Sequence, residues 1–316
     1  MVRTAEVVTP NHPDKICDRI SDAILDECLK QDPNTRAAIE TMGGHGIITV
    51  TGELTTEAFV NVPEVVKEVY GKDIGVQTNI VRQSPQIAQG VDTGGAGDQG
   101  IMIGYACNDN EDKVPEEYFQ ARKLAQFIYN EYPYDGKTQV TIGSTGLVRV
   151  VASFCCAPAE ELVKMVETFF RYTDYEIESI HCNPAGDWNL GGFDADAGLT
   201  GRKLAVDNYG PRVPLGGGAF SGKDATKVDR SAAYMARRIA VDYLQKYNAQ
   251  EVKVELAYAI GYDQPLQATA YVDGNLETIK GYDLSPKGII EFLDLKKPIF
   301  SRTAEWGHMG HNFNWK

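Results

Sequence analysis

The stretch GGGAFSGKDATKVDR, residues 216–230, joins a run of glycines to alternating basic and acidic side chains. Glycine has no side chain, so a glycine-rich backbone can approach a bulky ligand closely. The cations suit a polyphosphate, and the carboxylates between them suit the divalent ion that accompanies one. A solvated loop followed by a salt-bridged helix fits the same residues equally well. The spacing matches neither the P-loop nor the dinucleotide-binding glycine motif.

This basic stretch belongs to an acidic protein. The chain has 316 residues and a formal net charge of −13. Nucleic acid and anionic membrane surfaces are therefore not expected partners, because a negative protein repels both at long range. Arg202 and Lys203 add two further cations upstream of the glycine run. We expect a compact anion to bind where these cations gather.

Three further features indicate the class of protein. No apolar run approaches the length of a membrane span, and the N-terminus MVRTAEVVTP lacks the apolar core of a signal peptide. The six cysteines, at 17, 28, 107, 155, 156 and 182, form no C-x-x-C pair and no regular framework. The sequence thus predicts a cytoplasmic protein with reduced, mostly buried thiols.

Helix and strand patterns recur along the chain at intervals of roughly one hundred residues. Pro13 suits the first turn of a helix, and isoleucines at 16, 20 and 24 give that helix one apolar face. The predicted helices are 13–31, 63–70, 116–129, 160–172, 229–247 and 286–295, and the predicted strands are 36–41, 46–56, 101–106, 252–262 and 266–273 with a hairpin over 139–153. The glycine-dense segment 90–100 is predicted to be a mobile or ligand-covering loop.

A helix, a strand pair and a further helix thus appear three times. The order predicts an α+β fold of three pseudo-symmetric subdomains, each a small sheet covered by helices. We place the N-terminal subdomain at 1–107, the central one at 108–186 and the C-terminal one at 187–316.

Five segments resemble one family, the S-adenosylmethionine synthetases (methionine adenosyltransferases), in their order along the chain. The resemblance extends from about Ala5 to Trp315. The segments are HPDKICDRISDAILDECLKQDP from residue 12, GAGDQGIMIGYA from 95, DAGLTGRKLAVDNYG from 196, GGGAFSGKDATKVDRSAAYMARR from 216 and AYAIG from 257.

The resemblance implies an enzyme that condenses ATP with L-methionine and then hydrolyses the tripolyphosphate to pyrophosphate and phosphate. It also implies Mg²⁺ and K⁺ as cofactors and a homodimer, or a tetramer, with active sites between two subunits. The methionine sulfur carries no proton, so its attack on the ribose C5′ needs no general base. Catalysis should come from positioning and from cations aimed at the leaving tripolyphosphate.

The family's catalytic roles transfer to positions that match its motifs. His12 resembles the histidine that assists C5′–O cleavage beside the triphosphate. Asp14 and Asp229 resemble Mg²⁺ ligands, and Glu40 matches the K⁺ ligand. The residues that match the catalytic polyphosphate clamp are Arg202, Lys203, Lys223 and Lys227, with Lys137 as a further catalytic nucleotide-site residue.

The substrate-binding positions transfer in the same way. Glu53, Gln83 and Asp196 match residues that hold the amino and carboxylate ends of methionine, and Lys227 and Ile260 also border that substrate. The nucleotide site would further include Asp98, Asp196, Trp188 and Ile260, the last two against adenine. Structural alternatives remain open: Glu40 and Glu53 could be solvated strand ends, and Ile260 could be core. Asp224 and Arg230 are interpreted as structural ion-pair partners.

The sequence also departs from the family pattern. Segments 71–83 and 90–95 are shorter than usual, and the second is the family's mobile lid, so turnover or product retention is expected to differ. Asn11, Trp188 and Ala225 replace the usual Gly, Phe and Pro, and most of the C-terminal extension is absent. Two other function classes remain as alternatives: a catalytically silent paralogue that binds nucleotide or a partner protein, and an unrelated nucleotide-dependent kinase or ligase.

Overall fold

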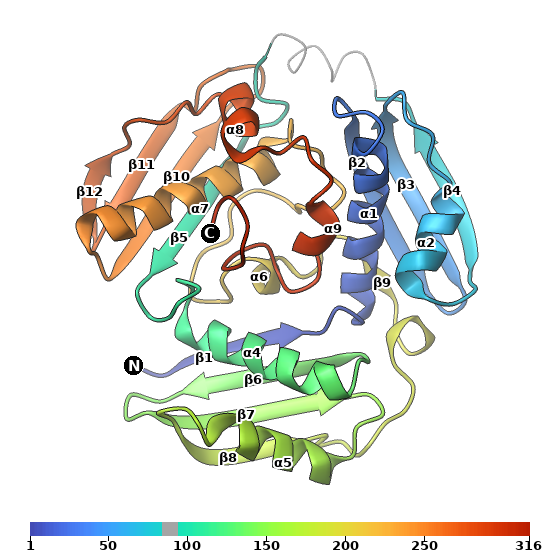
Figure 1. Cartoon of the computed structure of the whole chain (residues 1–316), viewed down its shortest axis with the longest axis vertical. Coiled ribbons are helices and arrows are strands. Elements are labelled where there is room, and N and C mark those ends of the chain that lie inside the picture. Colours follow the sequence, from blue (N-terminus) through green and yellow to red (C-terminus); the bar gives the residue numbers. More distant parts are fainter. Residues whose placement is uncertain (84–93) are drawn as a thin grey trace.

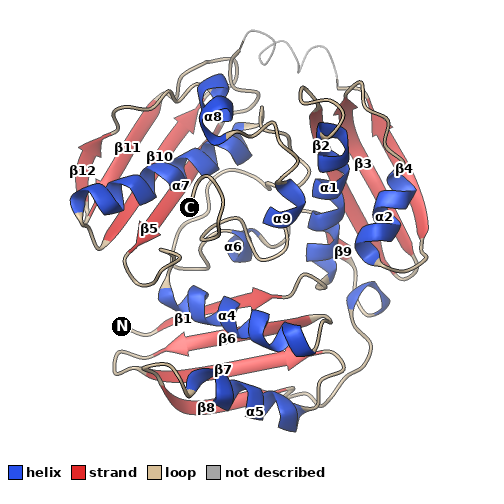
Figure 2. Cartoon of the chain, viewed as in Figure 1, coloured by secondary structure: helices blue, strands red, loops and turns tan. Residues whose placement is uncertain are grey.

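The computed structural model describes residues 1–83 and 94–316. Its described part contains three four-stranded sheets, each packed against helices, which confirms the predicted α+β class. Figure 1 shows one lobe for each sheet around a centre that holds α6, α9 and the C-terminal segment, and Figure 2 shows how helices cover each sheet. Most of the predicted lid, residues 90–93, lies outside the described residues.

The first sheet has the order β4-β3-β2-β9, and three of its four strands come from the N-terminal third of the chain. β2 and β3 form the predicted antiparallel pair, while β4 adds parallel to β3. Pro13 opens helix α1 as predicted, and the isoleucines at 16, 20 and 24 are buried. The elements are α1 (Pro13–Leu29), β2 (Arg36–Gly44), β3 (Ile47–Thr55), α2 (Val62–Tyr70), β4 (Gly75–Val81) and β9 (Gly198–Leu199).

The second sheet repeats this plan in the order β1-β6-β7-β8. β6 and β7 form the predicted hairpin, and β8 adds parallel to β7. The elements are β1 (Arg3–Val8), α4 (Glu116–Glu131), β6 (Gly136–Ile142), β7 (Leu147–Phe154), α5 (Ala159–Phe170) and β8 (Glu176–Cys182).

The third sheet, β12-β11-β10-β5, is antiparallel throughout. Its long helix α7 packs on β5 and β10. The elements are β5 (Gly100–Cys107), α7 (Val228–Tyr247), β10 (Glu251–Tyr258), β11 (Gln267–Val272), β12 (Asn275–Thr278) and α8 (Pro286–Leu293). Between the lobes lie the short elements η1 (Gly192–Asp194), α6 (Leu204–Asp207) and α9 (Phe300–Thr303).

Each sheet takes one strand from a distant part of the chain. The N-terminal strand β1 pairs with β6, β5 pairs with β10, and β9 pairs with β2. Of these three strands only β5 was predicted, over 101–106, and its apolar pattern does not say which sheet it joins. The linear division at residues 107 and 186 stays a prediction, since the sheets exchange strands across it.

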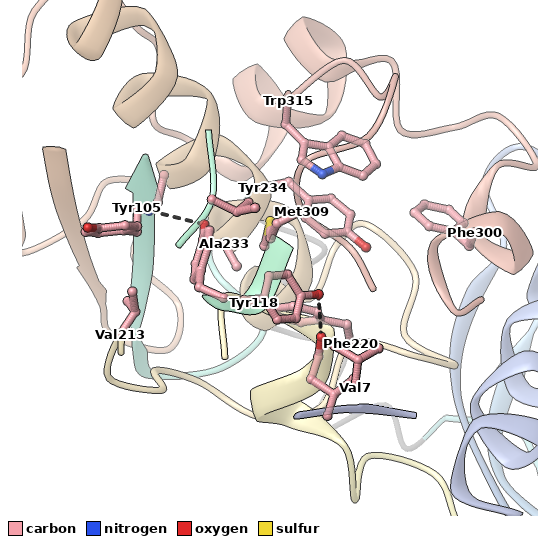
Figure 3. Packing of buried hydrophobic residues seen from close by; sticks show 14 of the residues in the cluster. Val7, Tyr105, Tyr118, Val213, Phe220, Ala233, Tyr234, Phe300, Met309 and Trp315 are labelled. Atoms are coloured by element: carbon pink, nitrogen blue, oxygen red, sulfur yellow. Dashed lines mark hydrogen bonds between the residues drawn. The ribbon is translucent and has the colours of Figure 1, made fainter. Parts of the chain in front are cut away.

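The C-terminal segment supplies part of the central core. Trp315 is fully buried and stacks on Tyr234, with ring centroids 3.9 Å apart and planes at 4°. Its indole N–H donates to the His308 carbonyl at 2.7 Å. Figure 3 shows Trp315 above Tyr234, with Met309 and Phe300 nearby. In the described residues, no helix is both long and apolar enough to cross a membrane.

Gly104 provides a test of how closely α7 packs on β5. A Cβ at this position would lie 2.0 Å from the carbonyl carbon of Ala236, so a strand or helix must shift to accept it. We expect Gly104→Ala to lower the free energy of unfolding by about 1–3 kcal/mol in urea denaturation. The control is Gly143→Ala, whose Cβ would lie 3.3 Å from its nearest neighbour, the Leu147 carbonyl oxygen. Equal stabilities of the two variants would contradict the close packing.

Candidate active site

The first cluster of predicted site residues forms where the N-terminus of α1 meets residues 198–203. The carboxylate of Asp14 is 1% exposed and accepts the Lys203 ammonium at 2.5 Å and the Leu199 N–H at 2.9 Å. Arg202 Nε lies 3.4 Å from the same carboxylate. Burial alone would raise the pKa of Asp14, but the hydrogen bonds from Lys203 and Leu199 outweigh it and the pKa is lowered. Asp14 is therefore an anion held between two cations.

A glycine in β9 permits this meeting. β9 pairs with β2 at Gly43↔Gly198, and a Cβ at Gly198 would lie 2.2 Å from the carbonyl carbon and oxygen of Pro13. Any larger residue would push the segment away from α1. Gly198 thus allows Arg202 and Lys203 to lie at the N-terminus of α1.

His12 caps α1 and belongs to the same cluster. Its Nδ1 accepts the Asp14 N–H at 3.2 Å. Burial and then the positive charge of Lys203 lower the pKa of His12 to about 4. Lys137 lowers this pKa further, while Asp14 and Asp196 oppose the shift. A neutral imidazole that accepts at Nδ1 carries its proton at Nε2, so His12 offers an N–H donor near pH 7.

The lowered pKa of His12 makes the protein less stable in acid. The unfolded chain protonates His12 near pH 6.5 and the folded chain near pH 4, so unfolding binds a proton between these values and stability falls as pH falls. We expect His12→Asn, which keeps a capping side chain, to gain roughly 1–3 kcal/mol relative to the wild type between pH 6.5 and pH 4. Urea unfolding across this range measures the difference. A pH-independent difference would contradict the shift.

The second cluster is formed by Lys223 and Asp229, which follow the glycine run at 216–218. Lys223 Nζ donates to Asp229 Oδ2 at 2.7 Å, and the Gly218 N–H donates to Oδ1 at 2.8 Å. Gly222 has a φ of +82°, and a Cβ there would lie 1.9 Å from the Ile39 carbonyl oxygen. Only glycine fits this approach, which seats the segment against β2 through an isolated bridge, Ala38↔Lys223.

Strand β2 therefore connects the two clusters. It contacts the glycine run at Ala38 and β9 at Met42 and Gly43. Glu40 lies between these contact points and is exposed. The first cluster and the second border the same strand, with the predicted K⁺ ligand between them.

Lys227 forms an ion pair with Asp224 instead of joining either cluster directly. The Nζ–Oδ1 distance is 2.6 Å, and the ammonium side chain is 14% exposed. Asp224 also accepts the Ala37 N–H at 2.8 Å, which ties the pair to β2. This is the structural role expected for Asp224 from the sequence.

Arg230 has the buried structural role that the sequence indicated. Its guanidinium donates to both carboxylate oxygens of Asp22, at 2.7 and 2.8 Å, and both side chains are fully buried. It also donates to the Lys223 carbonyl at 2.9 Å and lies over the Phe300 ring. The ion pair thus fixes the backbone that carries Lys223.

Sequence reasoning missed the regular spacing of four aspartates along α1. Their carboxylates are buried, and each accepts a backbone N–H from a distant segment. We call them the aspartate row: Asp14 accepts from Leu199 (2.9 Å), Asp18 from Gly201 (2.8 Å), Asp22 from Gly222 (2.8 Å) and Asp26 from Phe300 (3.0 Å). The four-residue spacing in DKICDRISDAILD, which places all four on one helix face, was the available signal.

A buried lysine neutralises part of the aspartate row. Lys15 donates to Asp18 at 3.1 Å and to Asp207 of α6. Burial raises the pKa of Asp207 to about 7, against the opposing charge of Lys15. Lys15 and Arg230 therefore compensate Asp18 and Asp22, while Lys203 pairs with Asp14.

The remaining predicted site residues are not bonded into these clusters, although the charges of Lys137 and Asp196 act on His12. Lys137 is 45% exposed and pairs with Glu6 at 3.4 Å, and Trp188 donates its indole N–H to Asn183 at 3.3 Å. In the described part of the chain, no hydrogen bond or ion pair joins them to the two clusters. The same holds for the half-buried Glu53 and Gln83 and for the exposed Asp98, Asp196 and Ile260.

The carboxylates fit a metal that a substrate helps to hold. Among the described residues, no group of three His, Cys, Asp or Glu side chains could hold a metal ion. Mg²⁺ commonly uses only one or two protein carboxylates together with substrate phosphates and water. The carboxylates of Asp14 and Asp229 lie beside cations and meet that donor requirement.

Models of protein families match almost the whole chain. The N-terminal domain of S-adenosylmethionine synthetase matches residues 1–91, the central domain residues 93–186 and the C-terminal domain residues 190–316. The two clusters take their residues from the first and the third of these matched domains.

Proposed function

Because the chain belongs to the S-adenosylmethionine synthetase family, we propose that the two clusters bind the triphosphate of ATP during its reaction with L-methionine. The protein is a methionine adenosyltransferase by its family. In the proposed reaction, the methionine sulfur attacks ATP C5′ and tripolyphosphate leaves. The same site then hydrolyses tripolyphosphate to pyrophosphate and phosphate.

The observation that carries this proposal is the pairing of site cations with site carboxylates. Asp14 holds Lys203, and Asp229 holds Lys223, at distances of 2.5 and 2.7 Å. Such pairs keep four charges in place without a nucleotide. A polyphosphate can take the lysines, and its accompanying cation can take the aspartates, so binding replaces each ion pair by two new ones.

The leaving group explains why cations matter here. Negative charge grows on the tripolyphosphate oxygen as the C5′–O bond breaks, and fixed positive charges lower the energy of that state. We assign this role to Lys223, Lys203, Arg202, Lys227 and Lys137. The neutral His12 donates its Nε2 proton in a hydrogen bond to the same oxygen without adding a proton-transfer step.

Two metal ions complete the proposed site. Asp14 and Asp229 would hold Mg²⁺, whose charge neutralises the phosphates when it is bound. Glu40, between the clusters on β2, would hold K⁺. Both assignments rest on the resemblance and on the exposed or ion-paired carboxylates described above.

The methionine and adenine positions require a second subunit in this proposal. Within the described part of one chain, no hydrogen bond or ion pair joins Glu53, Gln83, Asp98 or Ile260 to the phosphate clusters, and we propose that a partner chain completes these positions; Trp188 would stack on adenine. The open face of the first sheet exposes 55% of Met42 and 55% of Val81. We propose that such sheet faces meet in a homodimer, with a tetramer as the larger alternative.

The test is to incubate the purified protein with ATP, L-methionine, Mg²⁺ and K⁺ and to measure S-adenosylmethionine and phosphate together. The proposal expects both products in equal amounts, and no S-adenosylmethionine when methionine is omitted. Replacement of K⁺ by Na⁺ should reduce the rate if Glu40 binds K⁺. Bound ATP without either product would instead identify a catalytically silent paralogue. Light scattering of the same sample gives the oligomeric state.

A further inference from the structure

Two adjacent cysteines line a cavity beside the proposed nucleotide site. The cavity has a volume of ≈ 230 Å³ and lies between α2, the end of β7 and residues 189–194. Cys155 and Cys156 follow β7 directly and both border it. None of the proposed catalytic steps uses them.

The two sulfur atoms are unusually close for free thiols. The Sγ–Sγ distance is 3.5 Å, and Cys156 is exposed while Cys155 is 4% exposed. Cys156 adopts a left-handed backbone with a φ of +61°, which is uncommon for residues other than glycine. The Cys155 N–H donates to the Asp135 carbonyl at 2.9 Å, which helps to fix the start of this turn.

The thiol pair is attached to the segment that carries Trp188. The Cys156 N–H donates to the Trp188 carbonyl at 2.8 Å, and the Cys156 sulfur lies 3.8 Å from the Asn189 carbonyl oxygen. A Cβ at Gly191 would lie 3.1 Å from the Cys155 sulfur. The segment therefore contacts both cysteines, so we expect a change in the thiols to shift the position of Trp188.

The surroundings of the two thiols offer no metal site in the described residues, and burial together with Cys156 raises the pKa of Cys155 to about 12, which leaves the exposed Cys156 to react first. In the residues that the structure describes, no third His, Cys, Asp or Glu side chain completes a metal site with these thiols. Two thiols in contact, one of them open to solvent, are instead suited to disulfide exchange. The other cysteines (17, 28, 107 and 182) are not paired in this way, and three of these four are buried.

We propose that Cys155 and Cys156 are a redox-active pair that a small-molecule disulfide oxidises to a vicinal disulfide, displacing the Trp188 segment. The exposed Cys156 thiolate attacks the small disulfide and releases one small thiolate, which takes up the proton that Cys156 lost. The Cys155 sulfur then attacks Cys156 Sγ, and the second small thiol leaves with the Cys155 proton. The pair loses two electrons, and the small disulfide gains them.

Geometry makes this disulfide reversible and consequential. Adjacent Cα atoms are about 3.8 Å apart across a trans peptide, closer than the about 4.4–6.8 Å of ordinary disulfides. Such a bond is strained and easily reduced. Bringing the sulfurs together from 3.5 Å requires the Cys156 backbone to move, and its hydrogen bond to Trp188 moves with it.

The experiment treats the reduced full-length protein with oxidised glutathione, blocks remaining thiols with iodoacetamide and digests with trypsin. Cleavage after Arg149 and Lys164 leaves both cysteines on one peptide. We expect this peptide to lose two hydrogen atoms, to carry no alkyl group and to recover both thiols with dithiothreitol. Cys155→Ser should instead retain glutathione on Cys156, and Cys182→Ser should behave as the wild type.

A second measurement follows the Trp188 segment without any catalytic assay. Oxidation should change the tryptophan fluorescence of the wild type, and Trp188→Phe should lose that change, because the other two tryptophans pack elsewhere, Trp306 against Tyr129 and Trp315 against Tyr234. If the wild-type peptide stays reduced, or carries glutathione on Cys156 without forming the disulfide, the proposed redox pair is wrong. Disulfide formation with unchanged Trp188 fluorescence would overturn the displacement of the segment.

Discussion

Replacing Lys223 with alanine will lower the turnover number about 100- to 1,000-fold, while the KM for methionine changes little. The loss is expected because Lys223 Nζ is one of the fixed cations proposed to face the leaving tripolyphosphate, where negative charge appears only as the bond breaks. In the resting protein it holds Asp229 at 2.7 Å. Steady-state kinetics with methionine varied at saturating ATP separates the two constants.

The matched control is Lys164→Ala. It removes an exposed lysine of helix α5 that pairs with Glu161 at 2.8 Å and belongs to neither cluster. Its kinetics should equal those of the wild type. If Lys223→Ala mainly raised the methionine KM, then the assignment of Lys223 to the polyphosphate would be wrong. Thermal unfolding of both variants shows whether the loss reflects the site or the fold.

Arg230→Met should lower the free energy of unfolding by about 3–5 kcal/mol, the largest stability change that we expect from one substitution. The methionine fills a similar volume but leaves the Asp22 carboxylate fully buried without its cation. The Lys223 carbonyl also loses its donor at 2.9 Å. Chemical denaturation at pH 7 measures the effect.

An exposed arginine provides the comparison. Arg238 pairs with Asp242 at 2.8 Å on the same helix, but its side chain is 36% exposed. Arg238→Met should cost less than about 1 kcal/mol, because an exposed ion pair contributes little. A loss of similar size in both variants would show that burial of the Asp22–Arg230 pair is not what makes it important.

The sequence predicted most elements because their apolar patterns are local. The isoleucines of α1, the hairpin around Gly143–Gly146 and helix α7 all appear close to their expected bounds. The assignment of β1, β5 and β9 to sheets could not be predicted in this way. Strand exchange depends on contacts between residues far apart in the chain, and hydrophobic periodicity carries no information about partners.

The candidate site was predicted to a similar extent. The Asp14–Lys203 and Lys223–Asp229 pairs join residues from the quoted motifs. The other three members of the aspartate row, Asp18, Asp22 and Asp26, were visible as a spacing but had no predicted role, since a helix with an aspartate at every fourth position is more often solvated on that face. Whether these aspartates are solvated or buried depends on segments far along the chain, and the sequence does not show where those segments pack.

The aspartate row has a consequence for the order in which the active site assembles during folding. Loops usually acquire their shape from their own turns and from apolar contacts. Here the three segments that begin after residues 198, 221 and 299 each donate backbone N–H groups to the carboxylates of helix α1. Helix α1 thus serves as a template, and neither phosphate-binding segment can reach its final conformation before this helix has formed and docked.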